Sequence, residues 1–330
     1  MRLDDTNNNK KSLIIMPTPI SSAFLSTEEA ASLLKVHVNT IVRWIKTGAL
    51  PSSKIGRGYR IPREAIENRV GKVSRGTRII AMANQKGGVA KTTSTLNIAA
   101  GLALRDKKTL IVDLDPQGGS GVSIGIATDS LNKTVYNVLI DDGVGFSDII
   151  LKTTHGFDLA PSNIDLAGAE IELKQLLASE QVLKRKLEEV ADNYDFILLD
   201  CPPSLGMLTV NALTAAKEVF IPMAMEDLAL RGLGMLAKTI SKIRSITNPD
   251  LQYLGMLATK YDKTTINSKE IFAALNTAAR NTGIRLFNAY IPDTVRFKES
   301  PRYKTPLIIQ QPDHEGSKAY MTVVEEIING

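Results

Sequence analysis

The stretch that most constrains the fold is MANQKGGVAKTT, residues 82–93, because it places a glycine turn between an apolar run and a helix-forming segment. The usual phosphate-binding loop, G-x-x-x-x-G-K-[ST], has glycines where this chain has Gln85 and Ala90. Two adjacent glycines stand inside the loop instead, with Lys86 before them and Lys91 after them. Backbone N–H groups of such a turn and of the next helix N-terminus bind phosphate, so a phosphate site with one extra lysine is expected.

Apolar runs alternate with helical stretches through the rest of the chain. The expected strands are RIIAMAN, TLIVDLD, FDLAPS, FILLDCP, EVFIPM, YLGMLAT and LFNAYIP. Continuous apolar strands between helices indicate a parallel sheet that is covered on both faces. We therefore predict an α/β fold with a doubly wound, mostly parallel sheet, whose ligands bind at the carboxyl ends of the strands.

Acidic residues stand at two of those strand ends. Asp113 and Asp115 end TLIVDLD, and Asp200 ends FILLD. Any one acid at a strand end could merely cap the following helix. Acids at two strand ends beside a phosphate loop favour a metal and nucleotide site. Lys91 is expected to supply charge to the β- and γ-phosphates, Thr92 to offer a hydroxyl to Mg²⁺, and Asp200 to hold the hydration shell of the ion.

The N-terminal part of the chain is basic. Residues 1–76 hold 13 Lys and Arg against 6 Asp and Glu, a net charge of +7, whereas the remainder carries −2. STEEAASLL predicts a helix with a capping box between Ser26 and Glu29. NTIVRWIKTG predicts a second helix, capped by Asn39 and ended by Gly48. LPSSKIGRGYRIP then predicts two short strands around a turn, and REAIENRV a closing helix.

This order of elements is that of a winged helix-turn-helix, whose second helix enters the major groove. That helix would present Asn39, Thr40 and Arg43, and the hairpin would meet phosphates through Lys54, Arg57 and Arg60. The segment from Leu25 to Ile66 resembles excisionase and MerR-type DNA-binding domains. A helical adapter that binds protein is the alternative, but the basic excess on these surfaces favours DNA.

We expect four segments: a mobile arm at 1–24, the winged helix-turn-helix at 25–70, a polar linker at 71–77 and the sheet domain at 78–330. No apolar run reaches the roughly 18 residues of a membrane span, and the acidic, Asn-rich start is unlike a secretory signal. A cytoplasmic protein is therefore expected. The single cysteine, Cys201, is expected to be a buried small side chain and not a nucleophile.

Five motifs of the sheet domain together resemble the ParA/Soj family of DNA-partitioning ATPases. They are KGGVAKTT, VDLDPQG, APSNIDLAGAEIEL, YDFILLDCPPSLGMLTVNALTAA and TKYDKTT. The resemblance implies an ATP-bound sandwich dimer in which Lys86 crosses to the nucleotide of the partner subunit. It implies that Lys91 binds the phosphates of its own subunit, that Asp115 positions or activates the attacking water, and that Asp200 coordinates Mg²⁺ through water.

ATP or ADP and Mg²⁺ are the cofactors that the family implies, with weak basal turnover. The nucleotide-binding set carried over from the family is Lys86, Gly87, Gly88, Val89, Ala90, Lys91, Thr92, Thr93, Thr259, Lys260, Pro292 and Asp293. The family usually has glycine at position 90, so alanine there is expected to restrict the loop slightly.

The family also binds DNA without sequence preference through a basic surface, and a ParB-like centromere-binding protein stimulates its hydrolysis. The candidates for that surface are Lys263, Lys269, Arg296 and Lys298, although each could be an ordinary solvated charge. The resemblance thus implies a nucleoid-associated partition ATPase that also autoregulates its operon through the N-terminal domain. The alternative function is a transcriptional repressor for which the nucleotide is chiefly a switch.

Two other branches of the wider family fit less well. Iron–sulfur carriers need a pair of ligand cysteines in each subunit, and this chain has one cysteine. MinD needs a basic amphipathic helix at its C-terminus for the membrane, whereas SKAYMTVVEEIING holds two adjacent glutamates and few basic residues. Membrane anchoring is therefore not expected.

Overall fold

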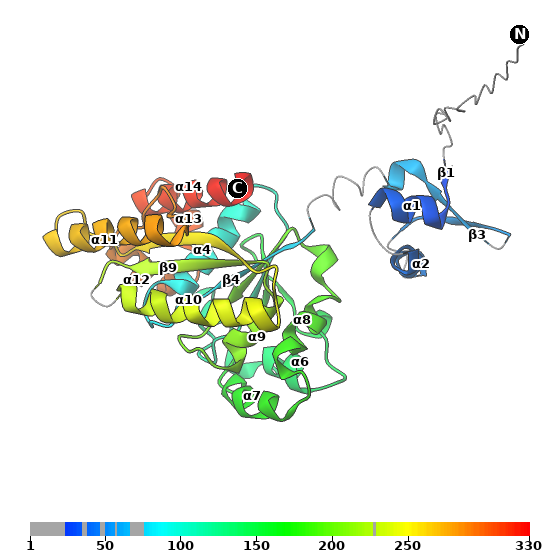
Figure 1. Cartoon of the computed structure of the whole chain (residues 1–330), viewed down its shortest axis with the longest axis horizontal. Helices are drawn as coiled ribbons and strands as arrows, with labels where there is room; N and C mark the ends of the chain where they lie inside the picture. Colours follow the sequence, from blue (N-terminus) through cyan, green and yellow to red (C-terminus); the bar gives the residue numbers. More distant parts are fainter. Residues whose placement is uncertain (1–23, 35–37, 47–49, 57, 67–75, 227–228) are drawn as a thin grey trace, which may run out of the picture. The chain divides into compact units, whose positions relative to one another are not determined.

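The computed structural model describes residues 24–34, 38–46, 50–56, 58–66, 76–226 and 229–330. The chain divides into two compact units, Met1–Arg75 and Gly76–Gly330 (Figure 1). Each unit has hydrophobic core residues of its own, so each is described separately.

The described part of the small unit contains a three-stranded sheet and three helical segments. Its elements are β1 (Phe24–Leu25), α1 (Thr27–Leu34), α2 (Val38–Lys46), β2 (Ser53–Ile55) and β3 (Gly58–Pro62), and residues 63–66 are also helical. The strands lie in the order β1-β3-β2, and both pairs are antiparallel. Leu25, Ile41, Trp44 and Ile61 are buried together in the core.

The capping box at the start of α1 is present. The backbone N–H of Glu29 donates to Ser26 Oγ at 3.1 Å, and the backbone N–H of Ser26 donates to Glu29 Oε2 at 2.8 Å. The predicted cap of α2 is wrong, because the helix begins at Val38, which packs against the core, and Asn39 lies inside it. Phe24, expected in the mobile arm, pairs with Pro62 as part of β1.

The large unit contains a seven-stranded sheet in the order β10-β9-β4-β8-β5-β7-β6. The strands are β4 (Arg78–Met82), β5 (Thr109–Asp113), β6 (Leu151–Lys152), β7 (Asp158–Ala160), β8 (Phe196–Asp200), β9 (Glu218–Ala224) and β10 (Gln252–Thr259). Only β6 pairs antiparallel, so the predicted parallel sheet is confirmed. Every residue of β5 and β8 is buried, as expected for strands covered on both faces.

Two details of the sheet differ from the sequence prediction. The two-residue strand β6 is too short to give an alternating pattern, and it was not expected. LFNAYIP was expected as a strand but forms only two isolated bridges, Met256 with Leu286 and Tyr261 with Pro292. The pairing is interrupted between the two bridges, because the Ala258 carbonyl accepts the backbone N–H of Ile291 at 2.8 Å and not that of Ala289, which a regular parallel ladder would use.

Helices cover both faces of this sheet. They are α4 (Lys91–Ala103), α5 (Gly119–Ser123), α6 (Val135–Ile140), α7 (Leu166–Glu172), α8 (Val182–Leu187), α9 (Met207–Ala215), α10 (Ala229–Ile246), α11 (Ile266–Thr282), α12 (Val295–Glu299), α13 (Leu307–Gln310) and α14 (Glu315–Asn329). Helices α4, α13 and α14 cover one face, and α6 to α11 cover the other. Neighbouring strand residues alternate between the two cores, since Ala81 faces one and Ile80 the other.

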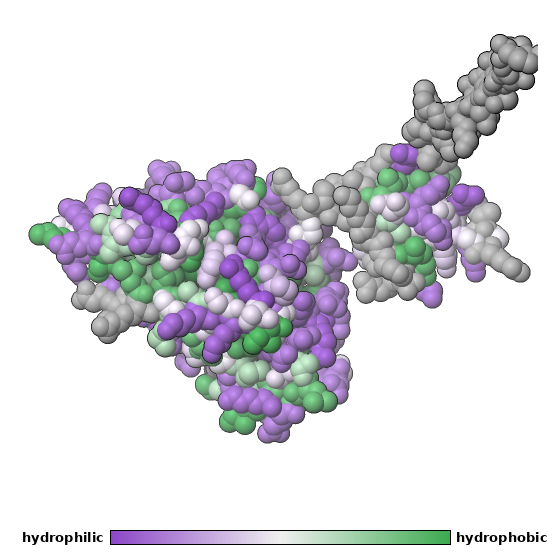
Figure 2. Space-filling model, in the orientation of Figure 1, coloured by the Kyte–Doolittle hydropathy of each residue, from purple (hydrophilic) through white to green (hydrophobic). Residues whose placement is uncertain are grey.

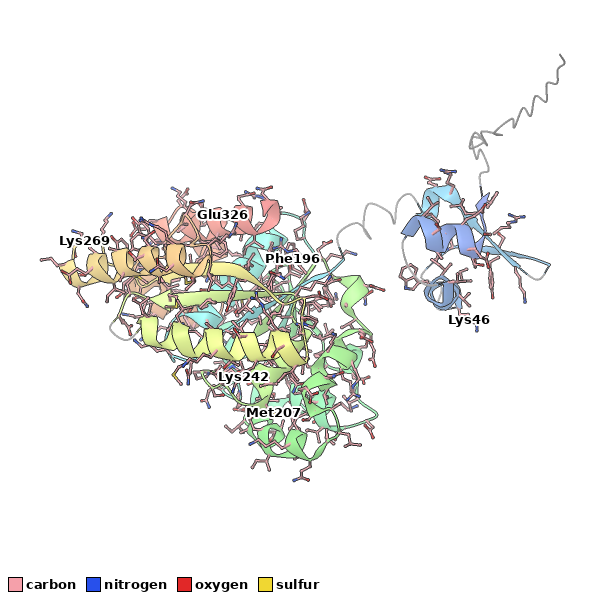
Figure 3. All side chains as sticks on the ribbon, in the orientation of Figure 1. Lys46, Phe196, Met207, Lys242, Lys269 and Glu326 are labelled. Carbon is pink, nitrogen blue, oxygen red and sulfur yellow. The ribbon has the colours of Figure 1, made fainter. Side chains whose placement is uncertain are left out.

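The surface of the large unit is mostly hydrophilic in the face that Figure 2 shows. Hydrophobic surface gathers over α7 and the segment after it, where Ile171 and Leu177 are 66% and 94% exposed. Lys269 on α11 and Lys242 on α10 point outward into solvent, whereas Phe196 lies within the layers (Figure 3). No helix among the residues described is long and apolar enough to cross a membrane.

Candidate nucleotide-binding site

Side-chain hydrogen bonds tie the loop between β4 and α4 to the neighbouring strands β9 and β10. Asn84, which is buried, donates to the carbonyl of Pro222 at 2.8 Å and accepts the backbone N–H of Lys86 at 3.0 Å. Thr259, at the end of β10, donates through Oγ1 to the carbonyl of Val89 at 3.1 Å. These hydrogen bonds to β9 and β10 therefore fix the backbone conformation of the glycine turn.

Two residues of this loop have left-handed backbone conformations. Gly88 has φ 71°, which glycine adopts without cost. Ala90 has φ 67° and ψ 33° and stands immediately before α4. A residue with a Cβ pays about 1–2 kcal/mol for this conformation, so the expected restriction at position 90 takes the form of backbone strain.

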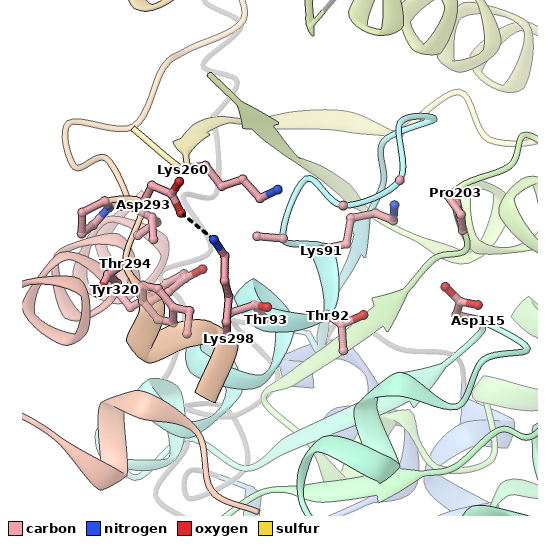
Figure 4. Close-up of a pocket in the computed structure, with 16 residues that line it drawn as sticks. Lys91, Thr92, Thr93, Asp115, Pro203, Lys260, Asp293, Thr294, Lys298 and Tyr320 are labelled. Atoms are coloured by element: carbon pink, nitrogen blue, oxygen red, sulfur yellow. Dashed lines mark ion pairs between the residues drawn. The ribbon is translucent and has the colours of Figure 1, made fainter. Parts of the chain in front are cut away.

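A cavity of about 350 Å³ lies over the carboxyl ends of the strands, beside the loop (Figure 4). The sequence-predicted nucleotide residues that line it are Gly87, Gly88, Ala90, Lys91, Thr92, Thr93, Asp115, Lys260, Pro292 and Asp293. Val89 and Thr259 are buried behind the loop, Asp200 is buried beneath it, and Lys86 is absent from the lining.

The far end of the cavity is formed by residues that sequence reasoning missed. Ile291, Thr294, Phe297 and Tyr320 line it, whereas Pro203, which was also missed, lies at the phosphate-loop end beside Asp115 (Figure 4). The rings of Phe297 and Tyr320 meet edge to face with centroids 5.6 Å apart, and the Tyr320 hydroxyl lies 2.9 Å from Ser94 Oγ on α4. Phe297 and Tyr320 come from α12 and α14, more than 200 positions after the loop, and no local pattern marks them. An apolar wall with a few polar groups suits a flat heterocycle.

Lys298 also differs from its predicted place. It was expected on a DNA-binding surface, but it lines the cavity, and its Nζ lies 3.8 Å from Asp293 Oδ1 (Figure 4). Arg296, on the same helix α12, forms an ion pair with Glu299 at 3.1 Å. Lys263 follows β10 and Lys269 lies on α11, and both are exposed.

Two buried carboxyls lie side by side at the ends of neighbouring strands, since Asp113 and Asp200 are register partners of β5 and β8. Asp200 accepts from Ser120 Oγ at 2.9 Å and from Thr95 Oγ1 at 3.3 Å. Burial is the main reason that the pKa of each carboxyl is raised, and the charge of Asp200 raises the pKa of Asp113 further. Hydrogen bonding from Thr92 and the charge of Lys91 act in the opposite direction on Asp200.

Asp115 lies in the cavity lining two residues beyond β5. Its carboxylate accepts the backbone N–H of Gln117 at 3.0 Å, and its carbonyl accepts from Ser162 Oγ at 2.6 Å. The acid is thus held at the phosphate-loop end of the cavity, with its carboxylate half exposed to the space (Figure 4). Hydroxyl and carboxylate oxygens are the ligands that Mg²⁺ prefers, so Thr92 and Asp200 fit a magnesium ion here.

The two lysines of the loop have different surroundings. Lys91 is 7% exposed and donates from Nζ to the carbonyl of Lys86 at 3.2 Å, and burial lowers its pKa. Lys86 forms an ion pair with Glu226, with Nζ to Oε2 at 2.7 Å, and its ammonium lies outside the cavity lining. Glu226 also pairs with Lys260 at 3.1 Å. Cys201 is buried and its pKa is raised, in keeping with an unreactive thiol.

A parallel sheet whose first strand leads through a glycine–lysine loop into a helix, with acids at neighbouring strand ends, defines a P-loop nucleoside triphosphatase. Two family models match the chain: one described as an AAA domain at residues 77–253, and one described as a helix-turn-helix domain at residues 24–70. The chain belongs to the ParA/Soj family of ATPases, with an N-terminal helix-turn-helix domain.

Three comparisons illustrate this. Sporulation initiation inhibitor protein Soj of Bacillus subtilis is 40% identical over 250 residues, which are 76% of this chain and 98% of Soj. Chromosome partitioning protein ParA of Caulobacter vibrioides is 37% identical over 76% of this chain and 94% of its own. A crystal structure of cobyrinic acid a,c-diamide synthase from Mycobacterium smegmatis, with bound ADP and magnesium, is 40% identical with a TM-score of 0.68, covering 77% of this chain and 94% of that one.

Proposed function

We propose that this protein is a DNA-partition ATPase that dimerises when it binds ATP and Mg²⁺. The observation that carries the proposal is the division of the two loop lysines, since Lys91 lines the cavity of its own chain while the Lys86 ammonium lies outside it. A lysine beside the phosphate loop whose ammonium lies outside the cavity of its own chain supports a role at the nucleotide of a second subunit. Curated relatives named for chromosome partitioning support the same conclusion.

The proposal gives roles to residues that line the cavity and to Asp200 beneath it. Lys91 and the loop N–H groups bind the phosphates, and the wall that contains Lys260, Pro292 and Asp293 holds the base. Thr92 and Asp200 hold Mg²⁺, which when bound neutralises charge on the phosphate oxygens. Asp115 orients the attacking water by accepting its hydrogen bond at the phosphate end.

DNA contacts divide between the two units. Specific binding is assigned to α2, which contains the positions of Asn39, Thr40 and Arg43, with Lys54 and Arg60 exposed on β2 and β3; Arg57 is outside the described residues. Non-specific binding of DNA by the dimer is assigned to Lys263, Lys269 and Arg296. Lys298 is assigned to the nucleotide cavity, which it lines. Partner stimulation by a ParB-like protein, autoregulation of the operon and nucleoid association complete the proposal.

A nucleotide-switched repressor is the competing function, and it would share the N-terminal domain and the cavity. The complete set of Asp115, Asp200 and Lys91 favours turnover as part of the function. The Mycobacterium structure carries the name of an amide-forming synthase, whereas the helix-turn-helix match fits a protein that acts on DNA.

The test is steady-state ATP hydrolysis by the full chain with Mg²⁺, alone, with DNA, and with DNA plus a ParB-like centromere-binding protein. We expect slow turnover that rises with DNA and rises further with the partner. Asp115→Ala should lower turnover at least tenfold while ATP-dependent dimers persist. Unchanged turnover in that variant would show that the catalytic assignment is wrong, and no response to DNA or partner would favour the repressor.

A further inference from the structure

Glu226 follows β9 and pairs with two lysines that come from different loops. Its Oε2 lies 2.7 Å from Lys86 Nζ, and its Oε1 lies 3.1 Å from Lys260 Nζ. Lys86 precedes the glycine turn, and Lys260 follows β10 and lines the cavity. One carboxylate therefore links the lysine outside the cavity to a lysine inside it.

The linked lysines lie at the edge of the phosphate loop. A Cβ placed on Gly88 would be 3.9 Å from Lys260 Nζ, so this ammonium lies close to the glycine turn (Figure 4). The side chains of Lys86, Lys260 and Glu226 are 31%, 35% and 44% exposed, so solvent and a ligand can reach the pairs. Hydrogen bonds from both lysines lower the pKa of Glu226, which keeps it anionic.

We propose that Glu226 is a positioning residue that retains Lys86 on its own subunit until nucleotide phosphates displace it. A phosphate entering beside Gly88 competes with the carboxylate for Lys260 first, since Lys260 already lines the cavity. Glu226 then holds Lys86 through one remaining pair, and the phosphates of a partner subunit draw that lysine across. The inference rests on the proposed function, in which Lys86 acts on the partner's nucleotide.

The solvent exposure of the two Glu226 ion pairs limits how much this carboxylate can change the dimer constant. An ion pair of this kind changes an equilibrium by about fivefold at most, because solvent screens it. Each dimer releases two lysines, one from each subunit, so the two factors multiply. Removing the carboxylate charge should therefore strengthen the dimer by about two- to 25-fold.

The experiment compares Glu226→Gln with the unmodified chain and with Glu325→Gln. Glu325 is a matched control, because its carboxylate pairs with Arg105 at 2.6 Å, is 42% exposed and lies on α14. Sedimentation with a non-hydrolysable ATP analogue and Mg²⁺ measures the dimer constant. We expect a stronger dimer for Glu226→Gln only, with a gain that shrinks at about 0.5 M salt. An unchanged or weaker dimer would overturn the inference.

A second measurement tests the ion pair between Glu226 and Lys86 in the nucleotide-free chain, where dimerisation plays no part. Acylation of lysine amines, followed by mass spectrometry, should label Lys86 faster in Glu226→Gln than in the unmodified chain or in Glu325→Gln. Equal labelling would show that Glu226 does not retain Lys86 in solution and would overturn the inference. Failure of the proposed function would look different, since the unmodified chain would then show no ATP-dependent dimer at all.

Discussion

Ala90 offers a direct test of strain in the phosphate loop. Its φ of 67° and ψ of 33° place a Cβ where left-handed backbone is unfavourable by about 1–2 kcal/mol. Ala90→Gly removes that cost but adds about 0.4–1 kcal/mol of unfolded-state entropy. The free energy of unfolding should therefore rise by about 0.5–1 kcal/mol. Ala90→Val should lose about 2 kcal/mol or more, because a β-branched side chain is still less compatible with positive φ.

Thermal unfolding of the nucleotide-free chain measures the effect. A unit of this size shifts by about 2–4 °C per kcal/mol, so Ala90→Gly should raise the melting temperature by about 1–4 °C and Ala90→Val should lower it by at least about 4 °C. Ala273→Gly is the control, because Ala273 is exposed within α11, where glycine costs about 0.5–1 kcal/mol. The argument is refuted if Ala90→Gly lowers the melting temperature as Ala273→Gly does.

Three further predictions concern the nucleotide, DNA and pH. Lys86→Ala should change the affinity of the monomer for ADP by no more than about twofold in a fluorescence titration, because the Lys86 ammonium lies outside the cavity lining. The same variant should form no ATP-dependent dimers, and dimers that persist would contradict a role across subunits. Arg43→Ala should weaken binding to one specific sequence by about tenfold or more while sparing non-specific DNA binding, and equal loss of both would contradict the division between units. Burial raises the pKa of Asp200 from 3.8 to about 6. Between these pH values the native chain holds a proton that the unfolded chain has lost, so the free energy of unfolding should fall as the pH rises from about 4 to 6. Asp200→Asn should flatten that fall in urea denaturation at each pH, and an equally steep fall would contradict it.

Features that depend on neighbours in sequence could be predicted, and features that depend on distant partners could not. The capping box at Ser26 and Glu29 spans three residues and is present as expected. Glu226 carries no local signal, because its partner Lys86 lies 140 positions earlier. The position of Lys298 in the cavity lining had no local signal either, because a charge pattern does not show that α12 lies against a cavity whose loop is about 200 residues away.

The last expected strand shows how a shift in hydrogen-bond register can interrupt a correct local pattern. LFNAYIP has the apolar residues of a strand, and two of its positions do bridge to β10 or the residues after it. The backbone N–H of Phe287 donates to the Met256 carbonyl, but the Ala258 carbonyl accepts from Ile291 and not from Ala289, so the register shifts by two residues. Periodicity reports the side-chain preference of a segment and contains nothing about such a shift in register against a distant strand.

The order of strands also governs when the nucleotide loop can take shape during synthesis. β4 is the first strand of the large unit to leave the ribosome, but it lies between β8 and β9, which begin more than 100 residues later. Asn84 and Val89 then wait for Pro222 and Thr259 to hold the turn. A growing chain therefore carries an unformed loop until most of the unit has been translated, so ATP cannot assist the early steps of its folding.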